Sequence, residues 1–237
     1  MPKYKINLSS KIQKWKIDNL SFDKLPESLL KESKENFKYL DINIDSLLAY
    51  DPPANTSART KSELLKVKSF MEHYNDDYFI SHLPEMDKDP INFIIDYFKE
   101  ISKKTIDNEV KKVLLSRDAE KLALKLKIHY NRLRPFQIAD YYNIDFNYNK
   151  SIQSGTGNTP SYPSGHTLTA YFTAHVLSHS FPEFKNKLLA RAKMVALSRI
   201  KEGVHFPSDN KFSIYLSEKI LLPAYIRYIN LSKVDGR

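Results

Sequence analysis

The sequence lacks cysteine altogether and has only five glycines among 237 residues. Without cysteine the chain can form no disulfide bond, no cysteine-ligated metal centre and no iron–sulfur cluster. The absence leaves the redox compartment open, because proteins of oxidising compartments can also lack cysteine. The low glycine content argues against a turn-rich all-β protein and favours helices.

Long apolar runs are also missing. No window approaches the roughly 18 consecutive apolar residues of a membrane span, so we expect no membrane-spanning helix. The first 20 residues are positively charged but hold no continuous apolar stretch, and so do not resemble a secretory signal peptide. We therefore expect a soluble protein that remains in the compartment where it is made, with the cytoplasm favoured.

Metal-binding patterns are scarce. His175 and His179 lie four residues apart on a predicted helix, which is the spacing of a zinc-binding pair. No Glu stands between them in an HExxH pattern, and no third ligand is evident. We therefore interpret them as a packed or surface pair and expect no metal cofactor.

Acidic residues are outnumbered, since 28 Asp and Glu face 37 Lys and Arg, for a net charge of +9. This balance favours anionic partners such as phosphate esters, nucleic acids or anionic lipids. Solvated helix faces explain many lysines equally well. No nucleic-acid-binding motif is recognisable and the charge alone supports that class of partner, so we expect no nucleic-acid partner.

The apolar spacing predicts an all-α protein with one compact helical bundle. We expect residues 1–50 to form an N-terminal extension of short helices packed on a core of residues 51–237. Tandem prolines at 52 and 53 exclude a helix there. Residues 136–163 have no sustained period and are expected to form a long loop. The predicted helices cover residues 57–75, 90–102, 108–133, 164–181 and 182–202, and a last one begins near residue 208.

The first of three notable clusters is Lys127 to Pro135, with the pattern K-x6-R-P. Seven residues are almost two helical turns, so Lys127 and Arg134 are expected on one helix face roughly 10 Å apart. There they could grip one anion from two sides. The alternative is an exposed basic face. Pro135 is expected to stop or kink the helix.

The second cluster is Pro163-Ser164-Gly165-His166 at a predicted helix start. Helix N-termini present unpaired N–H groups and a partial positive charge, and Gly165 has no side chain to keep an anion away. Ser164 is also a natural N-cap. Taken alone, the stretch fits an ordinary cap beside a histidine as well as it fits an anion cradle with a proton donor.

The third cluster runs from Ser198 to Asp209 and includes Arg199 and His205. A carboxylate four residues after a histidine can accept its ring N–H, which fixes the tautomer and exposes the other nitrogen. That nitrogen is then a nucleophile or a ligand. The alternative is a capping aspartate beside a structural histidine.

The three clusters together specify eleven residues in fixed order and spacing. At about one in twenty per position, a chance match is negligible. Over about residues 110–225 the chain resembles the superfamily that unites type 2 phosphatidic acid phosphatases, bacterial class A acid phosphatases and vanadium haloperoxidases. It is most similar to the soluble class A acid phosphatases.

The resemblance implies a helical bundle around one phosphate, and it implies a role for each motif residue. Lys127, Arg134 and Arg199 would neutralise the phosphoryl oxygens, and Ser164 and the Gly165 amide would donate hydrogen bonds to them. His205 would attack phosphorus and form a phosphohistidine, while Asp209 orients it. His166 would protonate the leaving alcohol and then activate water. Vanadate is expected as an inhibitor.

Three functions stay open. The first is a metal-independent phosphomonoesterase acting on small phosphate esters. The second is a vanadium haloperoxidase, with vanadate as cofactor. Such enzymes are longer and tend to carry Phe or His where this chain has Thr159. The third is an anion- or nucleic-acid-binding protein without catalysis. A homo-oligomer is left open, and the resemblance by itself would permit a periplasmic location.

The chain departs from the family after Asp209. Small apolar residues usually follow there and let helices pack closely, whereas this chain continues with Asn210, Lys211 and Phe212. The departure leaves the proposed chemistry untouched but bears on how the helices pack.

Overall fold

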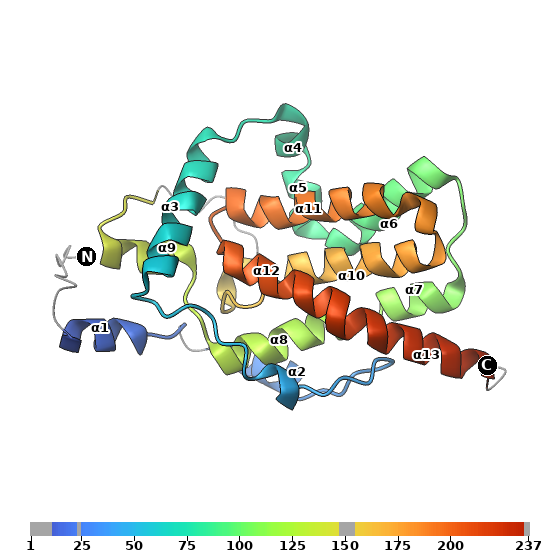
Figure 1. Cartoon of the computed structure of the whole chain (residues 1–237), viewed down its shortest axis with the longest axis horizontal. Coiled ribbons are helices and arrows are strands. Elements are labelled where there is room, and N and C mark those ends of the chain that lie inside the picture. The colour runs from blue at the N-terminus through green and yellow to red at the C-terminus, as the bar shows by residue number, and fades with distance from the viewer. Residues whose placement is uncertain (1–10, 23–24, 147–154, 235–237) are drawn as a thin grey trace.

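The computed structural model describes residues 11–22, 25–146 and 155–234, which form helices and loops without a strand (Figure 1). This confirms the predicted all-α fold. The α-helices are α1 (Lys11–Asp18), α2 (Glu27–Glu32), α3 (Ala58–His73), α4 (Asp77–Ser81), α5 (Leu83–Lys88), α6 (Pro90–Ser102), α7 (Asn108–Leu114), α8 (Asp118–Tyr130), α9 (Pro135–Ile138), α10 (Gly165–Ser180), α11 (Lys185–Lys201), α12 (Pro207–Leu216) and α13 (Leu222–Val234).

Helix α10 lies at the centre of the bundle, where α6, α8, α11 and α12 pack against it (Figure 1). Its sequence explains the position, because apolar residues occur on all of its sides rather than on one stripe. Leu168, Ala170, Ala174 and Val176 have no exposed surface. A short π-helical segment, Ser217–Leu221, joins α12 to α13.

Several predicted helices occur where the sequence placed them. The predicted helix 57–75 is α3, and the Oγ of Ser57 caps it by accepting the Thr60 N–H. The predicted helix 90–102 is α6, capped by the carboxylate of Asp89. The segment 182–202 forms a short 3-10 turn followed by α11. As expected, the double proline at 52 and 53 lies outside any helix.

The single helix predicted for residues 108–133 is wrong. It is interrupted at Arg117, whose φ is 65°, and it ends at Tyr130, after which Asn131 also has a positive φ of 46°. The interruption has a tertiary cause. The buried carboxylate of Asp118 accepts the backbone N–H groups of residues 38, 39 and 40 at 2.8–3.0 Å, a contact that sequence periodicity does not report. Pro135 was expected to stop or kink this helix. Instead it is the first residue of α9, a position that favours proline.

Two helices between α3 and α6 were not predicted. Helices α4 and α5 contain five and six residues, too few for an apolar period to be recognised. In the N-terminal region, Leu40 and Leu47 are buried in the main core. The proposed boundary near residue 50 stays a prediction. Within the described ranges, no helix is long and apolar enough to cross a membrane.

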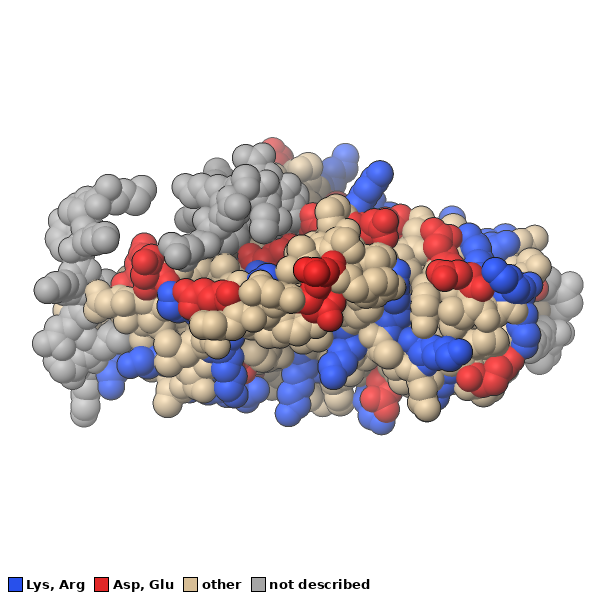
Figure 2. All heavy atoms as spheres, turned by 90° about the horizontal axis from the view of Figure 1, so that it is seen from above, with Lys and Arg blue, Asp and Glu red and all other residues tan. Residues whose placement is uncertain are grey.

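Charge is mixed on the face of the molecule shown in Figure 2. Lys and Arg side chains are interrupted there by Asp and Glu side chains and by uncharged residues. Where the described residues are visible on this face, they form no continuous basic patch of the kind that a nucleic-acid backbone would require.

Candidate active site

Four helix ends meet around the motif residues. The N-terminal ends of α10 and α12 and the C-terminal end of α11 lie at the same end of the bundle (Figure 1). Helix α8 packs against α10 and carries Lys127 in its last turn. All eight residues predicted for the site belong to these helix ends or to the segments that join them. The helix arrangement thus brings together residues that are up to 82 positions apart in sequence, from 127 to 209.

His205 and Asp209 form a buried pair. His205 Nδ1 lies 3.1 Å from Asp209 Oδ2, and both side chains are almost fully excluded from solvent. The other ring nitrogen, Nε2, lies 2.9 Å from Arg134 Nη1. A guanidinium only donates, so Nε2 must accept and Nδ1 must carry the proton. The tautomer predicted from sequence is therefore the one that the surrounding groups favour.

Arg134 is the fully buried cation beside His205. Its Nη1 also donates to the Val204 carbonyl at 2.8 Å. Its Nε donates to the Thr159 carbonyl at 2.8 Å, and its Nη2 donates to Thr159 Oγ1 at 3.2 Å. Thr159 thus orients the guanidinium through two oxygens, and a Phe at this position would lack the hydroxyl.

Lys127 is buried too, and its Nζ donates to the carbonyl of Pro160. Burial lowers its pKa well below the ordinary value, and the charge of Arg134 lowers it further. Its position corrects one prediction. Helix α8 ends at Tyr130, so Lys127 and Arg134 do not share a helix face. The extended segment after Asn131, rather than helical periodicity, brings Arg134 to the site.

Burial and nearby cations both lower the pKa of His205. Burial is the main cause that lowers it well below the usual value. Nearby positive charges lower it further, namely those of Arg134, Lys127, Arg199 and His166. An imidazole whose pKa is lowered in this way is neutral at neutral pH, which keeps a lone pair on Nε2.

Ser164 caps α10 as predicted, by accepting the Thr167 N–H. Its hydroxyl donates to Thr167 Oγ1 at 3.0 Å, and Thr167 in turn donates to Asn210 Oδ1 at 2.8 Å. Asn210 Nδ2 then donates to the Ala196 carbonyl. This chain of hydrogen bonds links α10, α12 and α11. It explains how Asn210 replaces a small apolar residue at a helix contact.

Phe212 is the second departure that the packing explains. Its ring is buried and stacks on Tyr162 with a centroid distance of 4.7 Å and an interplanar angle of 6°. At Gly165, an added Cβ would meet only Ala123 Cβ at 3.8 Å, an ordinary contact. Packing alone therefore does not require glycine at the first residue of α10.

His166 projects from the first turn of α10 toward α5. Its Nε2 lies 2.7 Å from the carbonyl oxygen of Asp87. A carbonyl only accepts, so Nε2 carries the proton and Nδ1 holds the lone pair of the neutral ring. Burial, followed by the charge of Arg199, lowers the pKa of His166 to about 3. Each of the two histidines is thus held in place through one of its ring N–H groups.

Arg199 has no exposed surface, and two carboxylates hold its guanidinium. Nη1 donates to Asp87 Oδ1 at 2.6 Å, and Nη2 donates to Glu202 Oε1 at 2.5 Å. The sequence reasoning missed both acids. Asp87 belongs to the unpredicted helix α5. Glu202 lies three residues after Arg199, a spacing that could have signalled an ion pair across one helical turn.

Arg132 and Glu63 were missed as well. Arg132 Nη1 donates to Asp209 Oδ1 at 2.5 Å and to Ser208 Oγ at 2.8 Å, and its guanidinium lies 4.1 Å from the centre of the Phe206 ring. Glu63 of α3 accepts from Ser208 and lies 3.8 Å from Arg132 Nη2. Asp209 is therefore held by a buried cation on the side away from His205.

Gly203 sets the path between α11 and His205. Its φ is 69°, and an added Cβ would lie 2.7 Å from Met71 Sδ and 2.9 Å from Phe146 Cε1. A larger residue would therefore be strained by its backbone and crowded by its neighbours. The turn lets the N–H groups of Val204 and His205 return to the Arg199 carbonyl.

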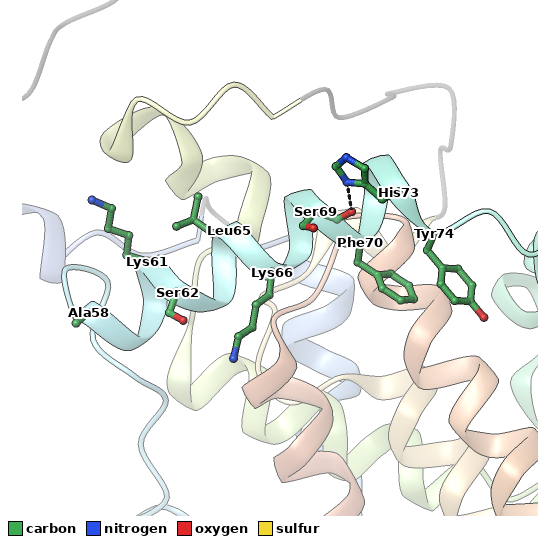
Figure 3. A pocket seen from close by; sticks show the side chains of 9 residues that line it. All are labelled: Ala58, Lys61, Ser62, Leu65, Lys66, Ser69, Phe70, His73 and Tyr74. Carbon is green, nitrogen blue, oxygen red and sulfur yellow. Dashed lines mark hydrogen bonds between the residues drawn. The ribbon is translucent and has the colours of Figure 1, made fainter.

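His175 and His179 do not join this site. Within the described residues, no group of three His, Cys, Asp or Glu side chains is placed to hold a metal ion. A groove of about 740 Å³ lies elsewhere, on the outer face of α3 (Figure 3). Its lining, which includes Lys61, Leu65 and Phe70, contains no motif residue.

Glu202 yields a prediction for stability. Burial raises its pKa to about 7, against 4.5 for an unperturbed carboxyl. The folded state binds this proton more tightly, so stability is lost as pH rises from about 4.5 to 7, by about 3 kcal/mol. Glu202→Gln, which cannot titrate, should lack this loss. Urea unfolding of both proteins across this range measures it, and parallel pH profiles would contradict the prediction.

Within the described residues, the fold and the site together define a helical protein in which three buried cations, Lys127, Arg134 and Arg199, lie near two histidines that are each held through one ring N–H. Residues 114–231 match the model of the PAP2 superfamily. This chain therefore carries a PAP2 superfamily domain, which confirms the resemblance inferred from the three motifs.

Curated relatives agree with this assignment. The chain is 36% identical over 104 residues to a non-specific acid phosphatase of Providencia stuartii, a match that covers 43% of this chain and 40% of that protein. It is 33% identical over 85 residues to an acid phosphatase of Zymomonas mobilis subsp. mobilis, covering 36% and 31%. It is 36% identical over 90 residues to a lipid A 1-phosphatase of Rhizobium etli, covering 37% and 36%. The matches span less than half the length of each relative.

Proposed function

We propose that this protein hydrolyses small phosphate monoesters without a metal ion and through a phosphohistidine intermediate. One observation carries the proposal. His205 is fixed by Asp209 at Nδ1, while its Nε2 lone pair faces the guanidinium of Arg134 at 2.9 Å. A nucleophile with an orienting acid on one side and a cation that can bind phosphate on the other suits phosphoryl transfer through a covalent intermediate.

The first half of the reaction transfers the phosphoryl group to the protein. The phosphoryl oxygens take over the Nη1 hydrogen bond of Arg134, which leaves His205 Nε2 free to attack phosphorus. Lys127 and Arg199 neutralise the charge that spreads over the equatorial oxygens. The ester P–O bond breaks as the P–N bond forms, and protonated His166 gives its Nδ1 proton to the leaving alcohol.

The second half regenerates the protein. Neutral His166 takes a proton from water, whose oxygen attacks the phosphohistidine and displaces His205. Inorganic phosphate is the product. Burial, followed by the nearby cations, lowers the pKa of His166, and a bound anion opposes the part that the cations contribute. Phosphate binding would therefore favour the protonated form that the first step uses.

The test is a chromogenic assay with para-nitrophenyl phosphate in the presence of EDTA, from acidic to neutral pH. We expect turnover that orthovanadate inhibits, because vanadate adopts the geometry of the pentacoordinate phosphorus. No turnover above a His166→Ala variant at any pH would contradict the proposal. A parallel incubation with vanadate, peroxide and bromide examines the haloperoxidase alternative, which bromide oxidation without ester hydrolysis would favour.

A further inference from the structure

Asp87 places a negative charge inside the cation-lined site. Its Oδ1 accepts from Arg199 Nη1 at 2.6 Å and lies 3.6 Å from His166 Nε2. The carboxylate is 24% exposed, whereas Arg199 is fully buried and His166 is 13% exposed. Asp87 thus lies between a cation proposed to bind the phosphoryl group and the proposed proton donor, on the more accessible side of both.

The charged groups around Asp87 come from several elements. His166 belongs to α10 and Arg199 to α11, and the carboxylate of Glu202, just beyond α11, interacts with it electrostatically. Glu85 and Lys88 of its own helix are exposed. In the described part of the chain, no ion pair or hydrogen bond joins Asp87 to a charged group of α4 or α6. Arg199 is therefore the one cation bonded to Asp87 there, and Glu202 shares it.

A carboxylate in this position distinguishes the protonation states of phosphate. It can only accept hydrogen bonds, so it repels an unprotonated phosphoryl oxygen but accepts a bond from P–OH. Arg199 cannot turn away from Asp87 easily, because Glu202 holds its other nitrogen. An anion that reaches Arg199 must therefore approach Asp87 as well.

We propose that Asp87 is a specificity-determining residue that makes the site select the monoanionic, protonated phosphoryl group over the dianion. The inference rests on the proposed function in so far as the site must bind phosphate. It goes further by naming the charge state of the substrate and the residue that selects it. The second ionisation of a phosphate monoester lies at about pH 6, so binding weakens as pH rises through that region.

The experiment measures binding of inorganic phosphate by calorimetry, from acidic to alkaline pH, for the wild type and for Asp87→Asn. The variant keeps the backbone carbonyl that holds His166. At alkaline pH, where inorganic phosphate is a dianion, it should bind phosphate about tenfold more tightly than the wild type, since one nearby like charge is removed. Its affinity should also depend less on pH. The matched control is Glu85→Gln, an exposed acid of the same helix, which should behave as the wild type.

The outcomes separate this inference from the proposed function. Equal or weaker phosphate binding by a folded Asp87→Asn variant, with the wild-type pH dependence, would overturn the inference and leave Asp87 as a support for Arg199. No phosphate binding by the wild type at any pH would overturn the proposed function. A structural defect could only weaken binding, so tighter binding is a result that a merely structural role does not produce.

A measurement on the wild type alone covers the case in which the variant does not fold. Sulfate is a dianion of similar size that carries no proton across this pH range. The inference predicts that phosphate binds at least about tenfold more tightly than sulfate at acidic pH, because only phosphate can donate to Asp87. Sulfate binding as tightly as phosphate there would overturn the inference.

Discussion

Replacing His205 with alanine should lower the rate of phosphate ester hydrolysis by roughly 10⁴-fold or more, as expected when a covalent nucleophile is lost. The fold should survive, because Asp209 keeps two other donors, Arg132 and the Phe206 N–H. The large effect on rate should therefore come without a comparable loss of stability. Single-turnover and steady-state rates, together with thermal unfolding, measure both.

The control for this variant is His179→Ala. His179 lies on α10, like His166, but it is exposed near the far end of that helix. Its removal should change the rate less than twofold. Rapid acid-free quenching with radiolabelled ester should trap a labelled protein in the wild type and none in His205→Ala. Label that persists in the variant would show that another residue is the nucleophile.

Replacing Arg132 with methionine should cost about 3 to 5 kcal/mol of stability, since it leaves the buried carboxylate of Asp209 without its cation. Arg132 is 4% exposed, and its Nη1 donates to Asp209 Oδ1 at 2.5 Å. Methionine occupies a similar length of chain, so the loss reports charge rather than volume. Activity should fall with stability, because Asp209 orients the proposed nucleophile. Urea unfolding at neutral pH measures the effect.

The loss of stability in Arg132→Met should depend on pH. Burial raises the pKa of Asp209, and Arg132 is the main group that lowers it again. Without Arg132 the folded state binds the proton of Asp209 more tightly. The penalty should therefore be largest at neutral pH and shrink as acidification protonates the carboxyl. A penalty that does not depend on pH would argue for packing instead.

Arg117→Met is the matched control. Arg117 lies just before α8, and Arg132 lies just after it. Unlike Arg132, Arg117 is 66% exposed and pairs with Glu120 at the surface. Such a pair contributes at most about 1 kcal/mol. A loss equal to that of Arg132→Met would mean that the arginine side chain, and not its contact with Asp209, explains the result.

The predicted site residues converge although part of the reasoning that placed them fails. Lys127 and Arg134 were expected on one helix face, yet α8 ends between them. The two cations still reach the same site because Asn131, with a left-handed backbone, and the segment after it redirect the chain beyond α8. Local propensity does not reveal this change of direction. The roles of the eight residues stay predictions, whereas their common location is a property of the fold.

Apart from Glu202, the acidic residues that hold the fold around the site were beyond sequence reasoning. Asp118 lies at the interruption of a predicted helix and binds the backbone of residues 38–40, and Glu63 accepts from Ser208 because α3 packs on α12. Asp87 lies on a helix of six residues with no readable period. Each contact joins segments more than 70 positions apart, and no local pattern encodes such a pairing.

By itself the sequence determined the helical class, the order of the main helices and the chemical set of two histidines, an aspartate and three cations. These follow from apolar spacing and from residue types at fixed intervals, both of which are local. The tertiary structure alone decided which nitrogen of each histidine carries its proton. It also decided that Arg132 supports Asp209 and that Asp87 and Glu202 both bind Arg199. Those features depend on distances between helices, which packing sets.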